Sequence, residues 1–386
     1  MAPSRTIGID VRHLLTPAPS GVGLSTRALL DALIQEADER TTSFRLFANA
    51  AGVSEPLPEA WRQKQNVEVV NPRVPNRLLN AGVFALGRPY LDTLLDGVDV
   101  VWSPNVLFLN VSKQTKFALT VHDLSFVLLP ETYSLRRQLW HKAVRAVELM
   151  KRADVLLAVS ETTKRDLITT LEIPEERIAV VPHGVPTLAA TEEQPSEWKW
   201  DASEPFLLSV STIEPRKNLL ALLQAYERLV EREAIPHKLV LAGGWGWKSS
   251  ELREALRRSP VADRVCVTGY VSEAEKTWLL TRATLVAFPS LYEGFGLPPL
   301  EAFQARTPVL ASSTAAVAET VGDAGLLVNP YDVGELTFGL SQLLHDPLLR
   351  EEFVRRGEER LNQFSWKASA RRALQAFSEM TLTERV

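Results

Sequence analysis

Two glutamates, Glu293 and Glu301, stand eight residues apart and enclose a loop that contains two glycines. An apolar run before the loop predicts a buried strand, and the paired prolines after it fit the first turn of a helix, where a missing N–H costs nothing. The loop should therefore present the unpaired N–H groups of Phe295, Gly296 and Leu297 at a helix N-terminus, which favours an anion.

The two carboxylates narrow the kind of anion that fits. Carboxylates make poor phosphate ligands, but their oxygens accept hydrogen bonds from hydroxyl groups. A molecule with an anionic centre and hydroxylated ends, such as a sugar nucleotide, suits the pattern. The helix dipole alone accounts for a glutamate such as Glu301 in a first helical turn, but it does not account for Glu293 beside a Gly-x-Gly loop.

A pair of cations and a histidine also follow predicted strands. Arg216 and Lys217 lie in the loop after the strand at 206–210, and His122 directly follows the strand at 117–121. The carboxyl ends of parallel strands border the ligand crevice of nucleotide-binding folds, where Arg and Lys suit a diphosphate. From these residues alone, a solvated charged turn and a structural histidine remain open alternatives.

The first predicted strand, at 7–11, leads through a loop with Gly21 and Gly23 to a helix at 24–34. This order of elements begins a nucleotide-type α/β domain. A dinucleotide site is not expected, because a third glycine is missing and the next strand ends at Asn49, with no acidic residue to hold a ribose.

Length and pattern predict two α/β domains. A chain of 386 residues suits two domains better than one, and alternating strand and helix patterns predict a parallel sheet in each. A stretch rich in Glu, Pro and Ser, residues 187–204, predicts a linker. We place the N-terminal domain at 1–186 and the C-terminal domain at 205–365, followed by a final helix.

Composition excludes several classes of partner and cofactor. The net charge of −4 provides no field that favours nucleic acid, and the single cysteine, Cys266, excludes an internal disulfide and a multi-cysteine metal site. No Asp-x-Asp or His cluster demands a metal. Without a signal peptide or a membrane-length apolar run, we expect a cytoplasmic protein. The basic helix expected at 135–153 suits peripheral contact with an anionic membrane at its inner face, although an ordinary surface helix is the favoured interpretation.

The pattern Glu293-x-Phe295-Gly296-x-x-x-x-Glu301 resembles the Glu-x7-Glu signature of retaining glycosyltransferases of family 4, which have the GT-B fold. Two further stretches carry the resemblance: Glu-Pro-Arg-Lys-Asn at 214–218 and Val-His-Asp-Leu at 121–124. The resemblance implies two Rossmann-like domains that face a central cleft. It also implies that the C-terminal helix, about 366–386, returns to the N-terminal domain.

The resemblance implies catalytic and donor-binding roles as well. His122 and Glu293 would contact the donor sugar, and Glu301 would contact the ribose hydroxyls. Arg216 and Lys217 would neutralise the leaving nucleoside diphosphate.

Four other residues gain a role only from the resemblance. Tyr270 and Val271 would meet the nucleobase, and Gly21 and Gly23 would lie near the donor phosphates and the acceptor. The family often has Arg-Tyr directly after the second of these glycines, where this chain has Leu-Ser. Only the glycines are therefore assigned in that stretch.

The implied function is transfer of a hexosyl group from a GDP-mannose or UDP-glucose type of donor to a hydroxyl of a glycan or polyprenyl-linked acceptor, without a cofactor or metal. Glu-Pro-Arg-Lys-Asn together with Ala-Gly-Gly resembles mannosyl-type members, which favours GDP-mannose slightly. A sugar-nucleotide epimerase of GT-B fold and a non-catalytic nucleotide-sugar-binding partner are the alternatives. The epimerase class lacks the Glu-Pro-Arg-Lys-Asn loop in this context, and the intact set of site residues counts against a non-catalytic role.

Overall fold

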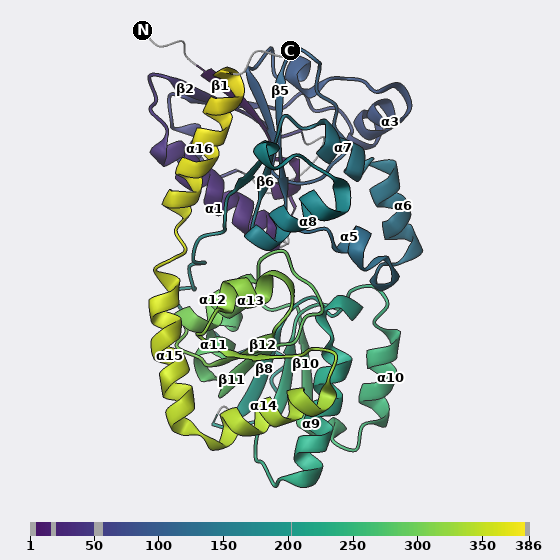
Figure 1. Ribbon diagram of the computed structural model, residues 1–386, viewed down its shortest axis with the longest axis vertical. Helices are drawn as coiled ribbons and strands as arrows, with labels where there is room; N and C mark the ends of the chain where they lie inside the picture. Colours follow the sequence, from purple (N-terminus) through teal and green to yellow (C-terminus); the bar gives the residue numbers. More distant parts are fainter. Residues whose placement is uncertain (1–4, 17–20, 50–56, 202, 383–386) are drawn as a thin grey trace. The chain divides into compact units, whose positions relative to one another are not determined.

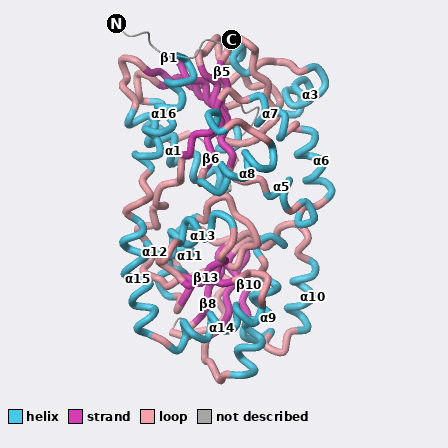
Figure 2. Tube along the Cα trace, in the orientation of Figure 1, coloured by secondary structure: helices cyan, strands magenta, loops and turns pink. Residues whose placement is uncertain are grey.

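The computed structural model describes residues 5–16, 21–49, 57–201 and 203–382, which form two compact units. Unit 1 comprises Met1–Leu124, Arg136–Gly184 and Ser365–Val386, and unit 2 comprises Ser125–Leu135 and Val185–Phe364. Each unit is built on its own parallel sheet with helices around it (Figure 1 and Figure 2). The structure thus confirms the predicted pair of Rossmann-like α/β folds.

The sheet of unit 1 has seven strands, all parallel. In sheet order they are β3 (Val67–Val70), β2 (Thr42–Phe47), β1 (Arg5–Asp10), β4 (Val100–Ser103), β5 (Lys116–Val121), β6 (Val155–Ala158) and β7 (Ile178–Val180). The strand order reverses between β1 and β4, and ligands of such sheets bind at the carboxyl ends beside the reversal. The central strands are buried on both faces, which is why they read as continuous apolar runs.

Helices surround this sheet. They are α1 (Gly21–Glu36), α2 (Glu59–Arg62), α3 (Asn76–Leu86), α4 (Leu91–Leu94), α6 (Leu135–Ala143), α7 (Ala146–Arg152), α8 (Glu161–Leu171) and α16 (Trp366–Leu382), with 3₁₀ turns at Arg12–Leu14 and Glu175–Arg177. Ser160 begins α8, because its Oγ accepts a hydrogen bond of 2.9 Å from the amide of Thr163.

Two predictions for this half of the chain are wrong. Gly21 and Gly23 do not lie in a loop, because α1 already begins at Gly21 and both glycines form its first turn. The single helix predicted at 135–153 is interrupted at Arg145, whose φ of 55° is left-handed and ends α6 before α7 begins.

The returning helix α16 packs on α1 within unit 1. Its inner face carries the buried residues Ala370, Ala373 and Phe377. The small alanines allow close approach of the helices, while the Phe377 ring lies 5.8 Å from that of Trp102 on β4. The final segment of the chain thus completes the core of the first unit, as the resemblance implies.

The sheet of unit 2 has six parallel strands. In sheet order they are β10 (Val265–Gly269), β9 (Lys238–Ala242), β8 (Phe206–Val210), β11 (Leu285–Phe288), β12 (Val309–Ser312) and β13 (Leu326–Val328). The order reverses between β8 and β11, so the loops after these two strands emerge side by side.

The helices of unit 2 connect these strands. They are α5 (Ser125–Leu128), α9 (Leu219–Arg232), α10 (Ser250–Arg258), α11 (Glu273–Arg282), α12 (Leu297–Gln304), α13 (Ala315–Val321), α14 (Val333–His345) and α15 (Pro347–Leu361), with 3₁₀ turns at Pro130–Thr132, Pro215–Lys217 and Ala262–Arg264. Ser272 and Glu275 form a capping box at the start of α11, in which each side chain accepts a hydrogen bond from the other's backbone amide.

Two segments do not pack as a division of the chain at the predicted linker, residues 187–204, would imply. Ser125–Leu135 belongs to unit 2, where Trp247 Nε1 donates a 2.8 Å hydrogen bond to the carbonyl of Thr132 and stacks on Tyr133. Trp198, in the stretch expected as a linker, also packs in unit 2, with its ring 4.9 Å from that of Trp278. Contacts between residues far apart in the sequence determine that both segments pack in unit 2.

We expect Phe377→Ala to lower the free energy of unfolding by about 3–5 kcal/mol, the range for deleting a large buried side chain. The cavity would lie under Trp102, between α16 and the sheet. Urea titration followed by tryptophan fluorescence measures the change. Gln375→Ala, on the exposed face of the same helix, is the control and should unfold like the unmodified chain. Equal midpoints for the two variants would show that α16 does not stabilise unit 1.

Candidate functional site

The loops after β8 and β11 are joined at the carboxyl edge of the unit 2 sheet. Asn218 ends the first loop with a left-handed φ of 57° and donates from Nδ2 to the carbonyl oxygens of Pro289, at 3.2 Å, and Pro330, at 2.7 Å. The amide of Leu291, in the second loop, donates a 2.8 Å hydrogen bond to the carbonyl of Arg216. These contacts hold the two predicted cations beside the predicted glutamate.

Glu293 is ion-paired with both cations. Arg216 Nη1 lies 2.7 Å from Glu293 Oε2, and Lys217 Nζ donates to Glu293 Oε1. Burial would raise the pKa of this carboxyl, but the two cations outweigh burial and lower its pKa to about 2. Glu293 is therefore ionised at physiological pH. Of the four residues predicted as catalytic, the structure brings three together: Arg216, Lys217 and Glu293.

A second carboxylate, Glu214, was not predicted as part of this cluster. It is buried, and Arg216 Nη2 donates to its Oε1 at 3.0 Å. Burial raises the pKa of Glu214, against the opposing effect of Arg216. Glu214 stands in the Glu-Pro-Arg-Lys-Asn stretch, so its position two residues before the arginine was a usable signal.

The N-terminus of α12 adjoins this cluster. Gly296 has a φ of 109°, which side chains rarely adopt, and no neighbouring atom would obstruct an added Cβ. The backbone conformation therefore requires glycine there. Thr320 Oγ1 fixes the preceding turn through a 2.6 Å bond to the carbonyl of Phe295. Among the residues described, none accepts a hydrogen bond from the amides of Gly296 or Leu297, so both can bind an anion.

Glu301 lies in α12 and is buried beside a lysine that sequence reasoning missed. Lys276 Nζ, from α11, donates to Glu301 Oε1 at 2.7 Å and also pairs with Glu273 at 2.9 Å. Burial raises the pKa of Glu301, and Lys276 opposes that rise. Lys276 was detectable, because it shares a helical face with Leu279 and Leu280. Glu301 Oε2 accepts from no described side chain and can accept from a ligand hydroxyl.

Tyr270 and Val271 follow β10, at the edge of the same sheet. The Tyr270 side chain is 64% exposed, so its ring is available for stacking on a flat ligand. No contact described for unit 2 joins these two residues to Glu293 or to Glu301.

His122 lies in unit 1, directly after β5. Its Nε2 is 2.9 Å from the carbonyl oxygen of Pro104, which can only accept, so Nε2 carries the proton and Nδ1 is an acceptor. Burial lowers the pKa of His122 and lowers that of His183 well below its ordinary value, which keeps both rings neutral.

His183 is a further residue that sequence reasoning did not assign. Its ring stacks on His122 at 5.6 Å and packs at the same distance against Trp366, the first residue of α16. Gly184 lies so close to Trp366 that an added Cβ would stand 2.4 Å from the Trp366 amide nitrogen. The start of the returning helix thereby positions His183 and, through it, His122.

The glycines of α1 lie in the same unit. Gly21 has open space around it, and Gly23 is buried. The next turn of α1 contributes Ser25 and Thr26 to the lining of a small cavity that His122 and His183 also border. Residues 17–20, which precede Gly21, lie outside the described residues.

Neither a metal cluster nor a membrane span occurs in the described part of the chain. No group of three or more His, Cys, Asp and Glu side chains there is arranged to hold a metal ion. Among the same residues, no helix has both the length and the apolar character needed to cross a bilayer.

Known families match both halves of the chain. Residues 19–187 match the family described as Glycosyltransferase Family 4, and residues 190–360 match the family described as Glycosyl transferases group 1. O-antigen chain mannosyltransferase B of Escherichia coli is 31% identical over 267 residues, which cover 67% of this chain and 69% of that protein. The serotype-specific mannosyltransferase WbdA of Escherichia coli is 25% identical over 93% of this chain, which spans 46% of its length.

Solved structures share the GT-B fold over nearly the whole chain. Sucrose-phosphate synthase from Thermosynechococcus elongatus superposes with a TM-score of 0.70 at 19% identity, covering 97% of this chain and 98% of that one. Anabaena Alr3699/HepE, solved with UDP and glucose, gives a TM-score of 0.67 at 20% identity, covering 97% and 100%. The related sequences are named as transferases, so the comparisons do not favour the epimerase or the non-catalytic alternative.

The ion pairs of Glu293 generate a pH-dependent contribution to stability. Its pKa falls from 4.5 to about 2 on folding, so the unfolded chain takes up a proton first as the pH falls through this window. We expect the difference in unfolding free energy between the unmodified chain and Glu293→Gln to be constant above about pH 5 and to shrink as the pH falls toward about 2. Urea titrations at a series of pH values measure it.

Glu68→Gln is the matched control for this experiment. Its side chain is 63% exposed and pairs with Arg45 at the surface, where ion pairs contribute little. A difference for Glu293→Gln that does not change with pH would contradict the assigned ionisation.

Proposed function

Because this chain belongs to glycosyltransferase family 4 and is a hexosyltransferase, we propose that it transfers a mannosyl group from GDP-mannose, with retention of anomeric configuration, to a hydroxyl of a glycan or polyprenyl-linked acceptor. The observation that carries the proposal is the buried cluster of Arg216, Lys217 and Glu293 beside the N-terminal amides of α12. Its groups suit a sugar attached to a diphosphate.

Leaving-group stabilisation is the proposed task of the cations and amides. When the bond between the anomeric carbon and the phosphate oxygen breaks, negative charge grows on the departing diphosphate. Lys217, Arg216 and the amides of Gly296 and Leu297 are donors already in place for that charge, so they stabilise the transition state more than the ground state.

The attacking group in this proposal is the acceptor hydroxyl, on the same face that the diphosphate leaves. Its oxygen forms the new bond to the anomeric carbon, and its proton passes to the departing phosphate. No protein nucleophile is needed. Glu293 is a poor candidate for one, because two cations hold both of its oxygens. Its pKa of about 2 also makes it a poor proton donor.

The carboxylates and the histidine are proposed to orient the donor. Glu293 and His122 contact the sugar, where carboxylate oxygens and the unprotonated Nδ1 of His122 accept from hydroxyl groups. Glu301 receives the ribose hydroxyls through its Oε2. Tyr270 and Val271 contact the nucleobase, and Gly21 and Gly23 lie toward the phosphates and the acceptor.

GDP-mannose is preferred as donor because the two related Escherichia coli sequences are named mannosyltransferases. UDP-glucose is the second candidate, since Anabaena Alr3699/HepE was solved with UDP and glucose. That neighbour is 20% identical, so it supports the fold and is weaker evidence for the identity of the donor. The reaction is proposed to take place in the cytoplasm, without a metal, and for a polyprenyl-linked acceptor at the inner membrane face.

We expect Lys217→Ala to lower turnover by about 10²–10³, the usual effect of removing one donor to developing negative charge. The measurement is release of nucleoside diphosphate from a fixed donor concentration, with and without acceptor. Lys64→Ala removes a lysine that pairs with Glu39 at the surface, at 2.9 Å, and should retain full turnover. Unchanged turnover in Lys217→Ala would remove this residue from the site.

Donor identity is tested by thermal unfolding with a panel of GDP- and UDP-sugars. A ligand present at 100 times its dissociation constant adds about 2.7 kcal/mol to stability, so the cognate donor should raise the melting temperature most. We expect GDP-mannose to exceed UDP-glucose, and free mannose to have no effect. A larger shift with UDP-glucose would replace the proposed donor and leave the proposed site intact.

A further inference from the structure

The charged cluster at the carboxyl edge of the unit 2 sheet is electrically balanced. It contains two cations, Arg216 and Lys217, and two buried carboxylates, Glu214 and Glu293. A sugar diphosphate carries two negative charges, of which the N-terminus of α12 offsets only a part, because a helix terminus is equivalent to about half an elementary charge. Buried charge without a counter-ion is costly, so a group that can change its own charge would favour binding of the diphosphate.

The two carboxylates of this cluster are not held equally. Both oxygens of Glu293 accept hydrogen bonds, Oε2 from Arg216 at 2.7 Å and Oε1 from Lys217. Glu214 accepts from Arg216 Nη2 through Oε1 at 3.0 Å, and its Oε2 accepts from none of the described side chains. The Glu214 side chain is 3% exposed, against 11% for Glu293. The charge of Glu214 is therefore the more deeply buried and the less compensated of the two.

The charged groups that face Glu214 are Arg216 and Lys217 of its own loop and Glu293 of the loop after β11. The loop after β9 also packs against Glu214, since an added Cβ at Gly246 would lie 3.4 Å from the Glu214 Cβ. That loop reads Gly-Gly-Trp-Gly-Trp and brings no titratable side chain. Burial is the largest influence and raises the pKa of Glu214, the two cations oppose the rise, and Glu293 adds to it.

We propose that Glu214 takes up a proton when the donor diphosphate binds at this cluster, while Glu293 stays ionised. Because Arg216 contacts Glu214 directly, a diphosphate that binds Arg216 is brought close to this carboxyl, and its charge favours the protonated form. The proton comes from the solvent and returns to it when the nucleoside diphosphate leaves. A neutral carboxyl still accepts from Arg216, so Glu214 is a positioning residue that acts through the arginine. The inference deepens the proposed function and rests on it.

Proton uptake makes donor binding depend on pH with a defined sign. The pKa of Glu214 would be higher in the complex than in the free protein, so the donor and the proton strengthen each other's binding by the same factor. The dissociation constant of the donor should therefore rise by up to about tenfold per pH unit as the pH rises between the two pKa values. Below that window Glu214 is neutral in both states, and above it Glu214 is ionised in both, so the constant should level off.

Calorimetric titration of GDP-mannose into the full chain measures the uptake directly. The heat of binding is recorded at one pH in two buffers that differ in ionisation enthalpy, and the difference gives the number of protons taken up. The titrations are repeated at pH values from the ordinary pKa of a glutamic acid, about 4.3, to above neutrality. Within the window we expect an uptake that approaches about one proton per donor bound, together with a dissociation constant that rises with pH.

Glu214→Gln separates the charge of this side chain from its hydrogen bond. The amide oxygen can still accept from Arg216, but the amide takes up no proton. This variant should bind GDP-mannose without proton uptake and, above the window, on the order of tenfold more tightly than the unmodified chain. Glu233→Gln is the matched control, because that carboxylate is 31% exposed in the same unit and accepts from Ser341 Oγ at 2.8 Å. It should bind the donor and take up protons like the unmodified chain.

Two results would overturn the proposal: GDP-mannose that binds without proton uptake at every pH, or an uptake that persists unchanged in Glu214→Gln. Both leave the proposed function intact, since the donor binds in each case. The first is measured on the unmodified chain, so it decides the question even where the variant does not fold. If neither GDP-mannose nor UDP-glucose binds the unmodified chain, the proposed function fails and this inference fails with it.

Discussion

The buried ion pairs of Glu293 constrain the carboxyl edge of the unit 2 sheet. The cations and the carboxylate come from loops 77 residues apart in sequence, and they meet because the strand order places β8 beside β11. Each ion has lost water and depends on its partners, so removing one leaves an uncompensated charge at a cost of about 3–5 kcal/mol. The two loops therefore cannot change independently, and the amides of α12 are held next to cations whose positions are already fixed.

Much of this edge follows from local sequence. The strand, glycine loop and proline-led helix around Glu293 are all local signals, and the glycine is needed because Gly296 has a left-handed φ. Buried parallel strands read as apolar runs, so the sheet of each unit was also predictable. The pairing of Glu293 with Lys217 depends on strand order, which the resemblance to a known family supplied and hydrophobic periodicity alone did not.

The features that sequence reasoning missed depend on contacts between distant segments. The stacking of His183 between His122 and Trp366 joins three separate parts of the chain, and no local pattern marks it. Ser125–Leu135 packs in unit 2 through Trp247, over a hundred residues away. Arg145 interrupts a helix although no glycine or proline, the usual helix-breaking residues, stands at that position. Lys276 is the exception, because the sequence spacing already places it on the apolar face of its helix.

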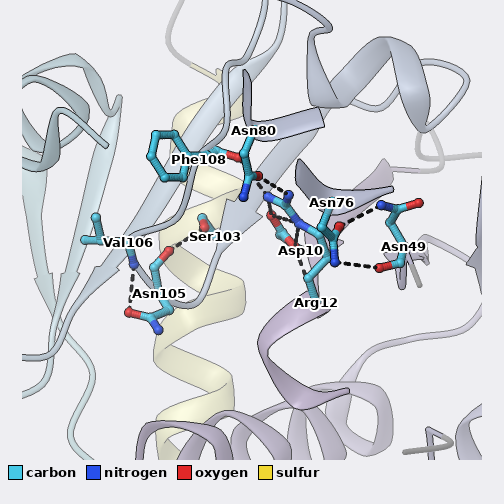
Figure 3. Close-up of polar contacts among 9 residues, drawn as sticks. All are labelled: Asp10, Arg12, Asn49, Asn76, Asn80, Ser103, Asn105, Val106 and Phe108. Atoms are coloured by element: carbon cyan, nitrogen blue, oxygen red, sulfur yellow. Dashed lines mark hydrogen bonds and ion pairs between the residues drawn. The ribbon is translucent and has the colours of Figure 1, made fainter. Parts of the chain in front are cut away.

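The two sheets use a buried arginine differently, which supports the proposed anion site in unit 2. Each sheet has an arginine–carboxylate pair next to its strand-order reversal: Arg12 with Asp10 in unit 1, and Arg216 with Glu293 in unit 2. Asp10 holds Arg12 through both of its oxygens, and the other donors of that guanidinium reach Phe108 and Asn80, so this cation is committed to the fold (Figure 3). In unit 2 the charges of Arg216 and Lys217 are matched by those of Glu214 and Glu293, but the amides of Gly296 and Leu297 donate to no described residue. Unit 2 therefore has backbone donors available for the proposed diphosphate, while the pair in unit 1 fixes the loops and the helix α3 that surround it.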